Sequence, residues 1–181
     1  MISFTPTAIP DVILCVPDVF RDARGFFQEC YHARKYADGG IRDVFVQDNR
    51  SRSCRAVLRG LHYQATKPQA KLVSCIQGKI VDVAVDIRSG SPTFGKWVAA
   101  ELSEENCHQL FIPKGFAHGF CVVSETAEIL YKCTDYYDPT DDRGVRWNDP
   151  DLAIAWPVQE PILSAKDAVQ PFLRDVFPTL R

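Results

Sequence analysis

Two histidines stand in segments whose composition suits acid–base catalysis. His62 lies in the segment LRGLHYQ and His118 in the segment IPKGFAHG. An imidazole titrates near neutral pH, so it can take or return a proton during a reaction. Arg59 and His62 have opposite parity and would point to opposite faces of a regular strand. A bulge at Gly60 would turn both toward one site; without it, the segment holds a core histidine beside a surface arginine.

Four further residues supply the other groups needed to remove a proton beside a carbonyl. Loss of that proton puts negative charge on the carbonyl oxygen, which the ammonium of Lys71 would stabilise. A phenol such as Tyr131 or Tyr137 on the opposite face would return a proton and invert the carbon. The carboxylate of Asp167 would hold one tautomer of the base and favour the imidazolium that forms. The alternative is that the tyrosines only pack at strand ends.

The segment that ends in His118 resembles one half of the metal-binding signature of cupin barrels, Pro-x-Gly-x-x-His. A cupin metal site also needs a His-x-His pair followed by a glutamate. This chain has His62-Tyr63-Gln64 there, and Lys71 falls near the position of the acidic ligand. An ammonium repels a cation, so we expect a cupin site that has been converted and holds no metal.

Composition excludes several classes of function. The 181 residues include 21 Lys and Arg against 23 Asp and Glu, and a net charge of -2 gives no field to hold nucleic acid or a membrane surface. Seven scattered cysteines without a CxxC pair indicate free thiols in a reducing compartment. The N-terminus lacks a signal-peptide pattern, and no apolar run reaches the ~18 residues of a membrane span. We expect a cytoplasmic protein with one domain over residues 1–181.

Short β-branched and aromatic runs broken by Gly, Pro, Asn and Asp dominate from Val12 to Cys133. They predict an all-β fold of about ten strands, in two packed sheets or a jelly roll. Gly78 joins two of these strands, and we expect those two to form a hairpin. The expected strands are Asp11–Val16, Gly25–Tyr31, Val44–Asn49, Val57–Gln64, Lys71–Gln77, Lys79–Ile87, Lys96–Leu102, Gln109–Ile112, Ala117–Val123 and Glu128–Cys133.

The C-terminal part carries the only helical signal. Ser164 precedes Ala165–Leu173 as a plausible N-cap, and Pro171 interrupts this short helical segment. The segment Tyr137–Pro161 lies between the last expected strand and this helical segment. It is rich in Asp and Pro, and we expect it to lie as an ordered connection over the barrel.

Taken in order, the motifs resemble those of the dTDP-4-dehydrorhamnose 3,5-epimerase family over nearly the whole chain. The pieces that carry the resemblance are FRDARGFF from Phe20, QDNRS from Gln47, LRGLHYQ from Leu58, KLV from Lys71, DVAVDIR from Asp82, SPTFG from Ser91, IPKGFAHGF from Ile112, YK from Tyr131 and LSAKD from Leu163. The resemblance implies a cupin-type jelly roll that uses no cofactor. It also implies a homodimer in which an N-terminal strand of each subunit joins the sheet of the other.

The resemblance further implies a reaction and a set of roles. The reaction inverts carbons 3 and 5 of dTDP-4-dehydro-6-deoxy-D-glucose and gives dTDP-4-dehydro-L-rhamnose, a step toward dTDP-L-rhamnose. The implied catalytic residues are the base His62, its partner Asp167, the enolate stabiliser Lys71 and the acid Tyr131. The residues implied to bind substrate are Arg24, Phe26, Glu29, Gln47, Asn49, Arg59, His118, Tyr137 and Lys166.

Within that second set, Arg59 and Arg24 would meet the diphosphate, with Arg24 coming from the neighbouring subunit. Gln47, Asn49 and Glu29 would bond the sugar or nucleotide, and Tyr137 with Phe26 would pack against the thymine. Asp142 stands where the family more often has Glu.

Three other interpretations remain open. A single-site epimerase or ketoisomerase would keep the fold and yield another product; the presence of both Tyr131 and Tyr137 favours the double epimerase. A non-catalytic sugar-binding cupin would not need the four catalytic residues together. A metal-dependent cupin enzyme would contain stoichiometric metal.

Overall fold

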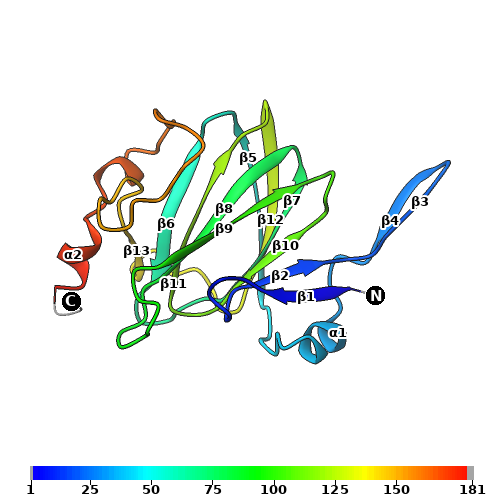
Figure 1. The fold of residues 1–181 in the computed structure, drawn as a ribbon, viewed down its shortest axis with the longest axis horizontal. Helices are drawn as coiled ribbons and strands as arrows, with labels where there is room; N and C mark the ends of the chain where they lie inside the picture. The colour runs from blue at the N-terminus through cyan, green and yellow to red at the C-terminus, as the bar shows by residue number, and fades with distance from the viewer. Residues whose placement is uncertain (1, 179–181) are drawn as a thin grey trace.

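The computed structural model describes residues 2–178 and consists mainly of two facing antiparallel sheets (Figure 1). The first has six strands in the spatial order β1 (Ser3–Pro6), β2 (Ile13–Val16), β10 (Gln109–Ile112), β7 (Lys71–Gln77), β12 (Thr126–Cys133) and β5 (Gln47–Cys54). The second has five, in the order β13 (Asp142–Gly144), β6 (Leu58–Gln64), β11 (Phe116–Val122), β8 (Lys79–Asp86) and β9 (Trp97–Ser103). From β5 to β8 and from β10 to β13, successive strands alternate between the sheets. The predicted all-β, cupin-type jelly roll is therefore confirmed.

The predicted hairpin at Gly78 is wrong. β7 pairs with β10 and β12, whereas β8 pairs with β9 and β11, so the chain changes sheets at Gly78. Gly78 does take a positive φ of 73°, and a Cβ there would lie 2.0 Å from the carbonyl oxygen of Thr126. Alternating hydrophobicity indicates which face of a strand is buried, but it does not indicate which distant strand will pair with it.

Three apolar clusters cover both faces of the sheets. Val73 and Ile129 of the six-stranded sheet meet Ile80 and Phe120 of the five-stranded sheet in the central core. On the outer face of the five-stranded sheet, the connection after β13 and the C-terminus contribute buried or half-buried side chains, among them Leu152, Trp156, Leu173 and Phe177. This confirms that the segment Tyr137–Pro161 lies over the barrel, although it also contains the unexpected strand β13. The third cluster, around Tyr36, covers the outer face of the six-stranded sheet.

The N-terminal part contains an arm that the strand pattern indicated only in part. β3 (Val19–Asp22) and β4 (Gly25–Gln28) form a separate two-stranded hairpin that projects from the body (Figure 1). The expected strand from Gly25 thus ends at Gln28, and its partner β3 was not anticipated. The short helix α1 (Ala33–Asp38) follows and was missed, because one buried side chain, Tyr36, gives no helical periodicity.

The C-terminal helix is shorter than expected. A 3-10 turn, η1 (Asp167–Val169), precedes Pro171, and α2 (Leu173–Val176) follows it. Ser164 accepts a hydrogen bond from the backbone N–H of Asp167 at 3.0 Å, but the N-cap of η1 is Lys166, so the prediction of Ser164 as the N-cap is wrong. No helix within residues 2–178 has the length and apolarity to cross a membrane. All seven cysteines are free and five are buried, which confirms the prediction of core thiols.

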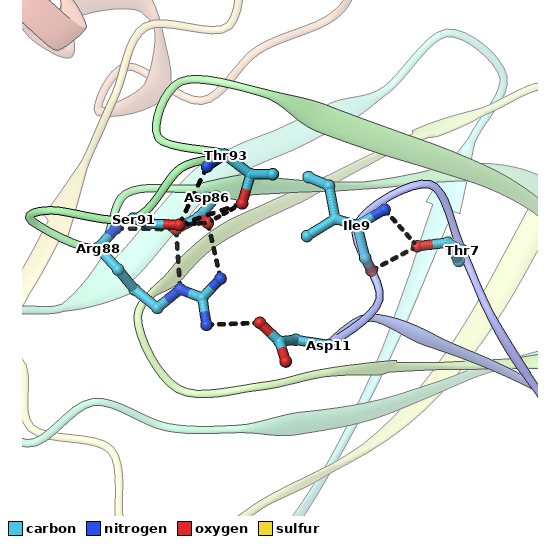
Figure 2. Close-up of polar contacts among 7 residues, drawn as sticks. All are labelled: Thr7, Ile9, Asp11, Asp86, Arg88, Ser91 and Thr93. Atoms are coloured by element: carbon cyan, nitrogen blue, oxygen red, sulfur yellow. Dashed lines mark hydrogen bonds and ion pairs between the residues drawn. The ribbon is translucent and has the colours of Figure 1, made fainter.

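A buried ionic network fixes the loop after β8 (Figure 2). Asp86 is fully buried and accepts hydrogen bonds from Arg88, Ser91 and Thr93, while Arg88 also reaches Asp11 at 2.7 Å. Burial raises the pKa of Asp86, but these hydrogen bonds outweigh it and lower the pKa to about 2. The network joins the loop to the turn between β1 and β2.

Candidate active site

A cavity of about 370 Å³ is lined by all four predicted catalytic residues. Its walls come from β6 and β11 of one sheet, β12 and the start of β7 of the other, and the segment that leads into η1. The volume lies in the range of small-molecule sites. The predicted site residues that line it are Arg59, His62, Lys71, His118, Tyr131, Lys166 and Asp167.

The predicted bulge in β6 is confirmed. His62 pairs with His118 and Arg59 pairs with Phe120, so β6 has one more residue than β11 between these two pairs. Gly60 has a φ of 129°, and a Cβ on it would lie 2.5 Å from the Cα of Gly119. Only glycine fits this conformation and this close approach. As a result, Arg59 and His62 both line the cavity despite their opposite parity.

His62 and Asp167 form a tight pair. The Nε2 atom of His62 lies 2.6 Å from Oδ1 of Asp167, whose side chain is only 4% exposed. Burial raises the pKa of Asp167, but hydrogen bonds from His62, Ser164 and the Gly60 N–H outweigh it, so the net pKa is lowered. An ionised Asp167 can only accept a hydrogen bond, so Nε2 of His62 must carry the proton that it donates. In the neutral imidazole this leaves Nδ1 as the basic atom.

Lys71 and Tyr131 complement this base. Burial lowers the pKa of Lys71, and Cys133, Asp82 and Asp142 oppose that shift in part. Burial raises the pKa of the Tyr131 phenol, which keeps it protonated and able to donate. A base, a cation and a neutral acid around one cavity can remove a proton beside a carbonyl, stabilise the enolate and return a proton.

His118 has a carboxylate partner of its own, Asp82, which the sequence did not suggest. Its Nε2 atom lies 2.7 Å from Oδ1 of Asp82, and Asp82 is fully buried. Burial lowers the pKa of His118, as do Lys71 and His62, while Asp82 opposes the shift. The only signal for this pair was a charged residue inside the apolar alternation of β8.

A second cavity of about 260 Å³ adjoins the first and shares His62, Lys71 and Tyr131 with it. Gln47, Asn49 and Tyr137, three of the residues predicted to bind substrate, line it. Gln47 donates to Oδ1 of Asn49 at 2.9 Å and accepts from the backbone N–H of Tyr137 at 2.9 Å. The second cavity therefore has a hydrogen-bonded group of residues and shares His62 with the first cavity.

Asp142 ties together two predicted residues at this second cavity. It accepts a hydrogen bond from the Tyr137 hydroxyl at 3.0 Å and forms an ion pair with Lys166. The hydrogen bond to Asp142 raises the pKa of Tyr137. The sequence identified Asp142 only as shorter than the usual family residue, so its place in the site was missed.

Three predicted residues line neither of these two cavities in their own chain. Arg24 lies at the tip of the arm and pairs with Asp22 at 2.6 Å. Phe26 is 59% exposed on β4, and Glu29 pairs with Lys35 beside α1. Among residues 2–178, no cluster of three or more His, Cys, Asp or Glu is arranged to hold a metal ion.

Known proteins are similar to this chain in sequence and in fold. The family model of dTDP-4-dehydrorhamnose 3,5-epimerase matches residues 6–175. A protein of that name from Pseudomonas aeruginosa is 58% identical over 165 residues, which cover 90% of this chain and 91% of that protein. Another from Neisseria gonorrhoeae is 54% identical over 162 residues, 89% of this chain, but the chain spans only 49% of its length.

A solved structure gives the same result at the level of the fold. The crystal structure of dTDP-6-deoxy-D-glucose-3,5-epimerase from Legionella pneumophila Philadelphia 1, in complex with dTDP-4-keto-L-rhamnose, superposes with a TM-score of 0.95. It is 50% identical, and the alignment covers 99% of this chain and 97% of that one. The resemblance inferred from the motifs is confirmed, and the chain belongs to the dTDP-4-dehydrorhamnose 3,5-epimerase family of isomerases.

Proposed function

We propose that this chain inverts carbons 3 and 5 of dTDP-4-dehydro-6-deoxy-D-glucose and releases dTDP-4-dehydro-L-rhamnose for dTDP-L-rhamnose synthesis. The observation that carries the proposal is the His62–Asp167 pair, which shares one cavity with Lys71 and Tyr131. Both reacting carbons flank the C4 ketone, so one base and one enolate-stabilising cation suffice for both positions.

Each inversion is a balanced proton exchange. Nδ1 of His62 takes the proton from the carbon beside the ketone, and the electron pair of that C–H bond moves to form the enolate. The Lys71 ammonium stabilises the enolate oxygen, and the Asp167 carboxylate stabilises the imidazolium. Tyr131 then gives a proton to the opposite face of the same carbon. His62 releases its proton to water and the Tyr131 phenolate takes one from water, which restores both groups before the second inversion.

The remaining cavity residues would hold the nucleotide and sugar. Arg59 and Lys166 supply positive charge at the cavity that holds His62 and suit the diphosphate, where a guanidinium can fork onto two oxygens. His118, Gln47 and Asn49 would bond the sugar or nucleotide. Tyr137 is 54% exposed and offers a face for the thymine ring.

The same proposal includes a homodimer that completes each site. Phe20 and Phe27 on the arm are 63% and 68% exposed, more apolar surface than a free hairpin should leave in water. β5 is an edge strand of the six-stranded sheet and can accept a further strand. The arm of one subunit would then bring Arg24, Phe26 and Glu29 to the cavity of the other. A single domain and a cytoplasmic location, where nucleotide sugars are made, also belong to this proposal.

Proton NMR of dTDP-4-dehydro-6-deoxy-D-glucose with purified protein in deuterated water, without added metal, tests the reaction. Deuterium is expected at both carbon 3 and carbon 5. Exchange at one carbon only would assign a single-site epimerase, the nearest alternative. Binding without exchange at either carbon would favour a sugar-binding cupin and contradict the proposal.

A further inference from the structure

Asp82 is a buried charge that the proposed mechanism leaves unused. Its exposure is 0%, one carboxylate oxygen meets His118, and the other oxygen, Oδ2, has no hydrogen-bond partner among the described residues. Burying a carboxylate with an unsatisfied oxygen costs free energy, and such groups in native proteins call for a functional explanation.

Strand register places Asp82 on β8, the strand next to β11, which carries His118. His118 on β11 pairs with His62 on β6, while on its other side β11 pairs with β8 so that Phe120 stands opposite Asp82. The histidines of two histidine–carboxylate pairs therefore stand on adjacent strands, and both line one cavity. Both pairs use Nε2 of the imidazole, so both leave Nδ1 without a carboxylate partner.

The charges around Lys71 give Asp82 a second effect. The titratable groups that act on Lys71 are Asp82 on β8, Cys133 on β12 and Asp142 on β13, and the imidazoles of His62 and His118 share its cavity. Asp142 is already engaged by Lys166 and Tyr137. Asp82 is thus the carboxylate near Lys71 that has no Lys or Arg partner among the described residues, so its negative charge is available to the Lys71 ammonium.

We propose that Asp82 is a positioning residue for the epimerase reaction: it holds His118 as the neutral Nε2–H tautomer, with Nδ1 free to accept a hydrogen bond from a sugar hydroxyl. Its carboxylate is also one of the groups that oppose the lowering of the Lys71 pKa by burial. The inference rests on the proposed function. A carboxylate accepts and cannot donate, so the hydrogen bond requires the proton on Nε2 of His118. Burial disfavours a second proton on the ring, which agrees with the lowered pKa of His118.

The chain supplies a matched control on the same strand. Asp86 is also fully buried on β8, but its partners are Arg88, Ser91 and Thr93, and it does not line the catalytic cavities. Comparing Asp82→Asn with Asp86→Asn separates the loss of charge at the site from the general cost of altering a buried aspartate. Asp82→Glu retains the charge and tests rescue.

The readouts are kcat, KM, the pH profile of kcat/KM and the melting temperature. Asp82→Asn should lower kcat/KM about 10- to 100-fold and raise KM, because His118 is no longer held to accept a hydrogen bond from the sugar hydroxyl. Removing a negative charge near Lys71 lowers the pKa of its ammonium, so the alkaline limb should move to lower pH. Asp82→Glu should restore much of that limb. Asp86→Asn should lower the melting temperature and leave the limb in place.

Two results would overturn the inference. One is a folded Asp82→Asn protein with wild-type kcat/KM and an unchanged alkaline limb, while the wild type exchanges deuterium as proposed. The other is an equal shift of the limb in Asp86→Asn. If the wild type exchanges no deuterium, the proposed function fails first, and Asp82 then has no reaction to position.

A measurement on the wild type avoids any loss of folding in the variants. Nitrogen-15 NMR of the histidine rings distinguishes a protonated from an unprotonated ring nitrogen. At pH 7 we expect His118 to be neutral, with the proton on Nε2. An Nδ1–H tautomer or an imidazolium at that pH would contradict the proposed role of Asp82.

Discussion

At the scale of single residues, most of the candidate site could be predicted because its proposed chemistry is carried by residue type. His62, Lys71, Tyr131 and Asp167 were inferred as base, cation, acid and partner, and the fold brings all four to one cavity. Asp82 and Asp142 were missed for a physical reason. Their roles depend on which side chains face them across strands and loops, and the sequence does not give that register.

Lys71→Met tests the enolate stabiliser. Methionine keeps much of the volume but removes the charge, so kcat should fall by an amount typical of a lost oxyanion donor, about 2.7–4 kcal/mol in activation free energy. KM should change little, because the enolate charge develops only as the proton leaves. Steady-state kinetics measures both constants. An effect confined to KM would show that Lys71 binds the substrate instead.

At the scale of elements, the strands were largely predictable and their connections were not. Short β-branched and aromatic runs located eight of the sheet strands within a few positions, but the predicted pairing of β7 with β8 was wrong and only one strand of the arm was predicted. Strand pairing in a jelly roll is set by packing between distant segments, which local patterns do not encode. The bulge at Gly60 was predictable because glycine and side-chain parity are both local signals.

Gly60→Ala should damage the site and the fold together. The new Cβ would lie 2.5 Å from the Cα of Gly119, and alanine at a φ of 129° is strained, at a cost of about 1–3 kcal/mol. We expect a lower melting temperature and loss of turnover as Arg59 and His62 shift. Gly40→Ala is the control, since Gly40 has a φ of 98° and nothing within 4 Å of its Cβ position. Equal losses in both variants would mean that backbone strain, and not the close packing of the bulge, matters.

The Asp86 network should contribute to stability in a defined pH range. Hydrogen bonds lower the pKa of Asp86 from 3.8 to about 2, so its contribution is fully present above 3.8 and is lost as the pH falls toward 2. The shift corresponds to about 2 kcal/mol of unfolding free energy. Urea unfolding of the wild type and Asp86→Asn between pH 2 and 6 measures it. The difference between the two proteins should shrink over the acid part of the range; a constant difference would contradict this assignment.

At the scale of the whole molecule, the single chain accounts for the catalytic centre but not for all proposed substrate contacts. Arg24, Phe26 and Glu29 lie on or beside the arm, away from the cavities of their own chain. Sequence reasoning could propose a second subunit only through the family resemblance, because exposed aromatic residues on a hairpin do not say which surface covers them.

Mixing two inactive variants tests the shared site. Arg24→Ala lacks the arm contact and His62→Asn lacks the base. In a mixed dimer, the cavity with an intact His62 would receive the intact Arg24 of the other subunit and regain activity. Each variant alone should turn over slowly, and their mixture after subunit exchange should recover part of the wild-type rate. No recovery in a mixture proven to contain mixed dimers would place Arg24 in its own chain's site.

One base, His62, serves both carbons in the proposed reaction. Deuterium exchange catalysed by His62→Asn tests this role most directly. Asparagine keeps a polar side chain of similar reach but cannot take the proton. With substrate binding verified by calorimetry, the variant should lose exchange at carbon 3 and carbon 5 together while the wild type exchanges both. Exchange that persists at either carbon would contradict the account and would assign that proton to a different base.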